Sequence, residues 1–160
     1  MISEQLQTLS ATLGEKLKQK NWQITCAESC TGGGIGYAIT SAAGSSNWFR
    51  RGFITYSNDA KTDLVGVSLE ALQEFGAVSE EVVQQMVTGA LKQALADVSV
   101  AVSGIAGPGG GSQHKPVGLV WFGFIIGGDT FTEKRFFTGD RNQVRDKTIQ
   151  HALQTIVDKI

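Results

Sequence analysis

The sequence contains no long apolar run and almost no net charge, and each absence argues against a class of protein. No stretch of about 18 apolar residues occurs, so no transmembrane helix is predicted. Residues 1–20 lack the basic start, apolar block and small-residue cleavage site of a signal peptide, so we expect a cytoplasmic protein. A formal net charge of −1 provides no long-range attraction to nucleic acid or to an anionic membrane.

Cysteine and histidine are also scarce, with two residues of each. Two cysteines do not make a disulfide framework, and the spacing of Cys26 and Cys30 differs from the redox Cys-x-x-Cys motif. A metal site would need further ligands, and none lies nearby in the sequence. We therefore expect neither a metal nor a cofactor, and we interpret His114 and His151 as incidental.

Glycine, by contrast, is abundant, with 20 residues gathered mostly in loops. The segment 27–34 reads Ala-Glu-Ser-Cys-Thr-Gly-Gly-Gly, which places Ser29 directly before a glycine run. Such a run lets the backbone approach a ligand closely before a helix begins. The N–H groups of Thr31, Gly32 and Gly33 would lack helical partners, which predicts an oxyanion site beside a nucleophilic Ser29. The alternative is a strand–helix turn that uses glycine only for packing.

A serine nucleophile needs a base, and Lys61 is the candidate because no histidine lies near Ser29. Lysine acts as a base only when neutral, and its ordinary pKa of about 10.4 must then be lowered by burial and neighbouring groups. Tyr56 and Asn58 offer a phenol and an amide that would position the amine. Two alternatives remain at this point: Lys61 is a solvated surface lysine, or Cys30 is the nucleophile.

Two further segments predict contacts with a ligand. Residues 104–116 form a glycine-rich loop that lacks the Gly-Lys-Ser/Thr of a P-loop, so we expect a backbone-lined wall for a ligand. Simple loop flexibility is the alternative. Arg141 and Arg145 lie four residues apart at the start of the last predicted helix and share a face, which predicts a phosphate site. Two unrelated surface cations would give the same spacing.

Hydrophobic periodicity and capping residues predict helices that alternate with strands and end in a hairpin. The predicted strands are 22–27, 48–56, 98–103, 118–126 and 130–138. The predicted helices are 3–21, 34–43, 58–64, 68–76, one that Ser79 caps and one that Asp140 caps. This order predicts an α/β fold: a single three-layer α/β/α domain over residues 1–160, with a mixed sheet that includes a C-terminal antiparallel hairpin. Ligands of such sheets bind beyond the strand ends, so the loops that carry the candidate residues should converge there.

The motifs, taken in order, resemble the CinA C-terminal domain family. The segments that carry the resemblance are 27–33, 56–61, 103–108 and 139–145, so it extends over nearly the whole chain. The resemblance implies hydrolysis of the carboxamide of nicotinamide mononucleotide to nicotinic acid mononucleotide and ammonia, in pyridine nucleotide recycling, without a metal. Larger members also carry an N-terminal domain that resembles a molybdopterin-binding domain. This chain lacks it, so only the amidohydrolase activity is expected here.

The resemblance also implies roles for individual residues. Ser29 is the nucleophile, Lys61 the base, and Tyr56 a third member that orients or relays a proton. The backbone N–H groups of Cys30, Thr31 and Gly32 hold the oxyanion. The substrate-binding residues are Asn58, Gly104, Ile105, Ala106, Gly107, Arg141 and Arg145. We expect a homodimer, because small enzymes often form symmetric pairs. A nucleotide-binding or sensor module without chemistry is the competing interpretation.

Overall fold

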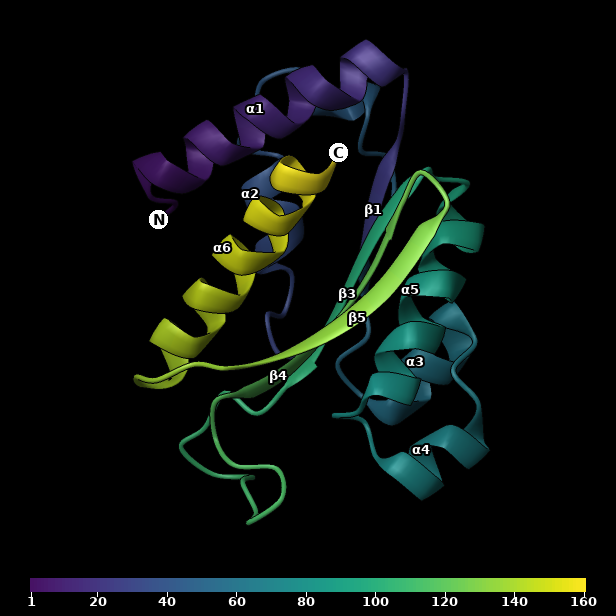
Figure 1. The fold of residues 1–160 in the computed structure, drawn as a ribbon, viewed down its shortest axis with the longest axis vertical. Helices are drawn as coiled ribbons and strands as arrows, with labels where there is room; N and C mark the ends of the chain where they lie inside the picture. Colours follow the sequence, from purple (N-terminus) through teal and green to yellow (C-terminus); the bar gives the residue numbers. More distant parts are fainter.

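Five strands form one mixed sheet in the order β2-β1-β3-β4-β5 in the computed structural model, which describes residues 1–160 (Figure 1). The strands are β1 (Ile24–Glu28), β2 (Phe53–Ile54), β3 (Val98–Gly104), β4 (Leu119–Ile126) and β5 (Asp129–Phe136). Strand β1 is parallel to β2 and β3, whereas the β3–β4 and β4–β5 pairs are antiparallel. The predicted mixed sheet with a C-terminal hairpin is therefore confirmed.

Helices cover both faces of this sheet and make the three predicted layers (Figure 1). One face carries α1 (Glu4–Lys20), α2 (Gly34–Ile39) and α6 (Arg141–Lys159), and the other carries α3 (Asn58–Val65), α4 (Leu69–Phe75) and α5 (Glu80–Ala94). The core is divided accordingly into clusters of 24 and 12 buried residues. Alternation along β4 sends Phe122 and Phe124 into the first cluster and Ile125 into the second.

The predicted helix starts are confirmed by their caps. The side chains of Ser3, Ser57, Ser68 and Ser79 each accept a hydrogen bond from an N–H in the first turn of the helix that follows. At the start of α6, Asp140 and Gln143 form the predicted capping box. These contacts are local in sequence, which is why the sequence alone could predict them.

Two glycines allow the helices of the second face to pack closely. A Cβ on Gly89 of α5 would lie 1.7 Å from the carbonyl oxygen of Val65 at the end of α3. A Cβ on Gly123 of β4 would lie 2.7 Å from the carbonyl oxygen of Val83. Glycine therefore lets α5 touch both α3 and the sheet, and this packing fixes the position of α3 and its Lys61.

Two predicted elements are shorter than expected. The strand predicted over 48–56 is wrong for most of its length, because only Phe53–Ile54 is strand and Phe49 makes an isolated bridge. Trp48 is instead buried against α1, where a Cβ on Gly14 would lie 2.6 Å from its ring. The helix predicted over 34–43 ends at Ile39. Tertiary packing of the tryptophan overrode the strand preference of this apolar segment.

The parallel strands bring the loops of interest to one edge of the sheet. Strands β1, β2 and β3 run in the same direction, so the segments after Glu28, Ile54 and Gly104 all leave from the same edge. Strand β5 also points that way, and α6 begins there (Figure 1). The predicted convergence of these loops is confirmed. None of the helices is both long and apolar enough to span a membrane.

Candidate active site

Ser29 and Lys61 meet directly at this edge. Ser29 follows β1, and its N–H donates to the Val102 carbonyl of β3, which holds the residue in line with the sheet. Lys61 projects from α3, and its Nζ lies 3.0 Å from Ser29 Oγ and 2.9 Å from the carbonyl oxygen of Thr55. The Lys61 residue is only 1% exposed and Ser29 is 9% exposed. Lys61 is therefore not a solvated surface lysine.

Burial lowers the pKa of Lys61 below its ordinary value, because the charged ammonium loses its hydration. The hydrogen bonds of the amine fit the neutral form. A neutral amine can donate one N–H to the Thr55 carbonyl and use its lone pair to accept the Ser29 hydroxyl proton. An ammonium would donate to the same two oxygens, so it is the burial of the amine, and not the number of its partners, that favours the neutral form. The pair is thus arranged so that a neutral lysine faces a serine hydroxyl.

The glycine turn after Ser29 leaves three backbone N–H groups without a partner. The N–H groups of Cys30, Thr31 and Gly33 have no acceptor within the chain. The Gly32 N–H, which was also expected to be a donor to the oxyanion, instead donates to the Ser29 carbonyl at 3.0 Å and is therefore not free. A tight turn closes on itself in this way, because Gly32 has a left-handed φ of 58°. Cys30 and Thr31 are the unpaired donors that come first after Ser29 in the chain.

Glu28 caps the short helix that follows the turn. Its carboxylate accepts hydrogen bonds from the N–H groups of Ile35 and Gly36, at 2.7 and 2.9 Å, and from the Thr31 hydroxyl at 2.6 Å. A carboxylate at this place satisfies N–H groups that the first turn of a helix leaves unpaired. Glu28 thus holds the start of this helix and makes no hydrogen bond to Lys61.

Both cysteines are free thiols in the buried core. Burial raises the pKa of Cys30 to about 12, and burial beside Glu28 raises that of Cys26. A thiol with so high a pKa forms little thiolate at neutral pH, so Cys30 is poorly suited to act as the nucleophile. No group of three or more His, Cys, Asp or Glu side chains is placed to hold a metal ion.

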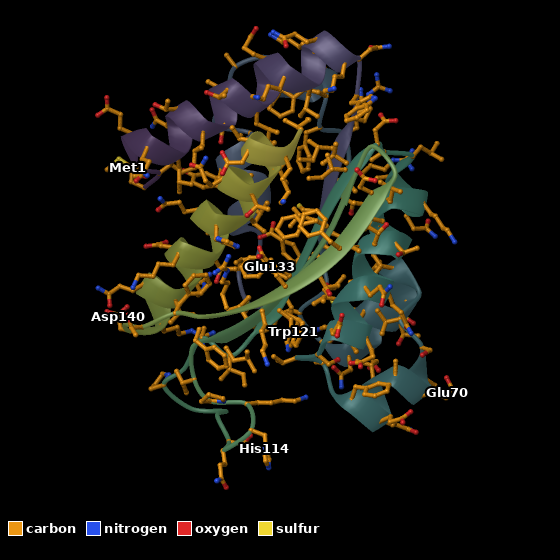
Figure 2. The ribbon with its side chains drawn as sticks, viewed as in Figure 1. Met1, Glu70, His114, Trp121, Glu133 and Asp140 are labelled. Atoms are coloured by element: carbon orange, nitrogen blue, oxygen red, sulfur yellow. The ribbon has the colours of Figure 1, made fainter.

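Arg141 and Tyr56 form the exposed rim of the site. Arg141 Nη2 donates to the Tyr56 hydroxyl at 3.0 Å, and Nη1 donates to the Gly107 carbonyl at 2.8 Å. Tyr56 makes no hydrogen bond to Ser29 or Lys61. The rim thus joins the segment after β2, the glycine loop and the start of α6, which is where Asp140 lies in Figure 2.

Only part of the backbone of the glycine loop between β3 and β4 is hydrogen-bonded within the chain. The N–H and carbonyl of Ile105 pair with Leu119 and Gly118, whereas the N–H groups of Ala106 and Gly107 have no acceptor. A Cβ on Gly104 would lie 2.6 Å from Val120, so this glycine serves packing. His114 lies at the far tip of the loop (Figure 2), and exposed Asn58 opens α3 without a side-chain contact.

Arg145, one turn further along α6, is held behind the glycine turn rather than at the rim. Its Nε donates to the Cys30 carbonyl at 3.2 Å and its Nη2 to the Thr31 carbonyl at 3.4 Å. The two arginines share a helix face, as their spacing predicts, but they contact different loops. Sequence reasoning also missed Thr55, whose carbonyl anchors Lys61, because a backbone acceptor leaves no signal in residue type.

The comparisons with known proteins agree with this architecture. The CinA C-terminal domain matches residues 6–160. The nicotinamide-nucleotide amidohydrolase PncC of Enterobacter agglomerans is 56% identical over 97% of this chain and 95% of that protein. The protein of the same name from Escherichia coli K12 is 52% identical over 98% and 95%. The crystal structure of competence/damage inducible protein CihA from Agrobacterium tumefaciens superposes with a TM-score of 0.94, at 41% identity over 99% of this chain and 97% of that one. This chain therefore belongs to the CinA C-terminal domain family.

Proposed function

We propose that this protein is an amidohydrolase that converts nicotinamide mononucleotide to nicotinic acid mononucleotide and ammonia. Two relatives that match it over nearly their whole length carry the name nicotinamide-nucleotide amidohydrolase. The observation that carries the mechanism is the 3.0 Å contact between Lys61 Nζ and Ser29 Oγ in a buried setting. In this proposal the reaction needs no metal or cofactor and serves pyridine nucleotide recycling in the cytoplasm.

In the first half of the reaction, Ser29 Oγ attacks the carboxamide carbon while its proton moves to the neutral Lys61 amine. The C–N bond of the tetrahedral intermediate then breaks, and the Lys61 ammonium returns the proton to the departing nitrogen, which leaves as ammonia. Water attacks the resulting ester with Lys61 again as base. The ester bond breaks, Ser29 recovers its proton, and nicotinic acid mononucleotide is released.

The negative charge of the tetrahedral intermediate is assigned to the free N–H groups of Cys30 and Thr31. Both are unpaired within the chain, and they belong to the first and second residues after the nucleophile. The N–H of the residue after a nucleophile is a common oxyanion donor in hydrolases built on a strand–turn–helix. Fixed donors of this kind contribute strongly, because they need no rearrangement as the charge forms.

In this proposal the residues of the rim bind the phosphate, the ribose and the ring of the substrate. Arg141 is exposed and retains N–H groups beyond those donated to Tyr56 and Gly107, so it is our candidate for the phosphate. Ala106 lines the same pocket as Arg141, and the unpaired N–H groups of Ala106 and Gly107 would contact the ribose or the ring. Tyr56 would orient the substrate from the position in which Arg141 holds it. Further contacts in this proposal come from Asn58, Gly104 and Ile105.

Ammonia release from nicotinamide mononucleotide tests the proposal. Ser29→Ala should abolish release while the far-ultraviolet circular dichroism spectrum stays unchanged. Ser99→Ala is the matched control, since Ser99 is also a buried serine and its hydroxyl donates to the Val87 carbonyl, away from the turn. Ser99→Ala should retain activity. Binding of the mononucleotide without any ammonia release by the wild type would favour a nucleotide-binding module instead. Loss of activity in EDTA would contradict the metal-free mechanism.

We propose that the expected homodimer forms through the outer edge of β2. Ile54 in this edge strand is 55% exposed, and Thr55 donates its N–H inward to Glu28, so the backbone groups of Ile54 point outward and are free to pair. Arg50 and Asp59 flank the strand with opposite charges, and neither forms an ion pair. A two-fold axis at Ile54 would bring each Arg50 near the partner's Asp59. Light scattering should show a dimer that Arg50→Glu weakens and that Arg50→Glu with Asp59→Arg restores.

A further inference from the structure

Arg145 holds the carbonyl face of the glycine turn. Its guanidinium reaches across from α6 and donates to two successive carbonyls, those of Cys30 and Thr31, at 3.2 and 3.4 Å. Gly32 lies beside the guanidinium, since a Cβ there would be in ordinary van der Waals contact with Nη2 at 3.5 Å. The Thr31 carbonyl has a second donor, the Gly34 N–H at 3.0 Å, but the Cys30 carbonyl has only Arg145.

The orientation of one peptide group thus depends on this arginine. The peptide bond that carries the Cys30 carbonyl also carries the Thr31 N–H, and in a planar trans peptide these two groups point in opposite directions. With the carbonyl drawn toward Arg145, the Thr31 N–H is turned away from α6. That N–H has no acceptor within the chain. A positive donor on the carbonyl also polarises the peptide group and makes its N–H a stronger donor.

We propose that Arg145 is a positioning residue that aligns the Thr31 N–H for the oxyanion, and that it does not bind the phosphate of the substrate. The inference rests on the proposed amidohydrolase function and revises the phosphate role expected from the spacing of Arg141 and Arg145. Arg145 acts through the backbone of the turn and touches no reacting atom.

The surroundings of Arg145 are poorly suited to a phosphate. The cavity beside it has a volume of about 200 Å³ and is lined largely by apolar side chains, among them Ile2, Leu6 and Ile149. Asp146 also lines this cavity, and its carboxylate would repel an anion. Arg141, by contrast, lies exposed on the rim with the free backbone N–H groups of the glycine loop.

Steady-state kinetics on two substrates test the proposal. Arg145→Ala should lower kcat for nicotinamide mononucleotide by about 10²–10³-fold, the loss typical of one oxyanion donor, with little change in KM. The same loss of kcat is expected with the phosphate-free riboside, because the carboxamide chemistry is shared. Arg145→Lys, which can still donate to one carbonyl, should recover part of the rate. Arg141→Ala is the matched comparison and should raise KM for the mononucleotide only. A rise in KM confined to the mononucleotide in Arg145→Ala would overturn the proposal.

Two further measurements test the positioning role of Arg145 without relying on catalytic rates. Calorimetric binding of the mononucleotide to Ser29→Ala and to Ser29→Ala with Arg145→Ala should give equal Kd values, and a Kd more than tenfold weaker in the double variant would overturn the proposal. The backbone amide resonance of Thr31 in an ¹⁵N-labelled sample should shift in Arg145→Ala, and an unchanged resonance would also overturn it. If the wild type released no ammonia, the proposed function would fail, and the Thr31 resonance would still test the positioning.

Discussion

Two replacements of Lys61 test the proposed removal of the Ser29 proton. They distinguish a lysine that acts as a base from one that acts only through its positive charge. Lys61→Met keeps an unbranched chain and removes the amine. Lys61→Arg keeps a positive charge but cannot lose its proton at any practical pH. If Lys61 acts as a base through its 3.0 Å contact with Ser29, both variants should be inactive. If Lys61 acts only by its positive charge, Lys61→Arg should retain activity.

The expected size of the loss follows from the two roles of the amine. General acid–base catalysis by a positioned group contributes about 10²–10⁴-fold. Lys61 acts first as base toward Ser29 and then as acid toward the leaving ammonia, so we place its loss at the upper end, about 10⁴-fold. That factor corresponds to about 5.4 kcal/mol of lost transition-state stabilisation. Because Nζ makes only two hydrogen bonds, replacing it removes few structural contacts.

The assay is ammonia release measured from pH 5 to pH 10. In the wild type, kcat should rise with pH as Lys61 loses its proton and reach a plateau below about pH 10.4, because burial lowers the pKa of this amine. The residual activity of Lys61→Met should not show this step. Activity of Lys61→Arg within tenfold of the wild type, or the same pH step in Lys61→Met, would refute the assignment of Lys61 as base.

Three further predictions concern the surroundings of the pair. Between the lowered pKa of Lys61 and its unfolded value of about 10.4, the folded state binds fewer protons, so the free energy of unfolding of the wild type relative to Lys61→Met should increase with pH in urea titrations. A difference independent of pH would contradict this. Cys30→Ser should retain kcat within about threefold, because the thiol pKa of about 12 makes it a poor nucleophile. A hundredfold loss in a folded protein would reopen its role. Gly89→Ala should destabilise by about 1–3 kcal/mol or more, since its Cβ would meet the Val65 carbonyl oxygen, whereas Gly109→Ala, with nothing within 4 Å, should change stability little.

Local signals in the sequence were sufficient for most elements of the fold. Serines at the helix starts, the capping box of Asp140 and Gln143, and the Gly127–Gly128 turn all act within a few residues of themselves. The segment around Trp48 failed because its conformation depends on a distant partner. Its aromatic and apolar residues favour a strand, but the ring is buried against Gly14 of α1.

The candidate site was predicted less completely than the fold. Residue types and the resemblance indicated Ser29 and Lys61, and the structure brings them into contact. Neither could show that the Gly32 N–H is used within the turn, that the Thr55 carbonyl anchors the amine, or that Arg145 points behind the turn. Each of these facts depends on a backbone direction, which the residue type does not encode.

The sequence by itself determined which chemical groups this protein can use and the order of its helices and strands, because side-chain identity and local capping are properties of short segments. Only the tertiary structure decided which of those groups are buried, paired or free. Burial lowers the pKa of Lys61, and packing between α3, α5 and the sheet sets its distance from Ser29. Both effects arise from residues far apart in the chain, so they exist only once the fold has brought those residues together.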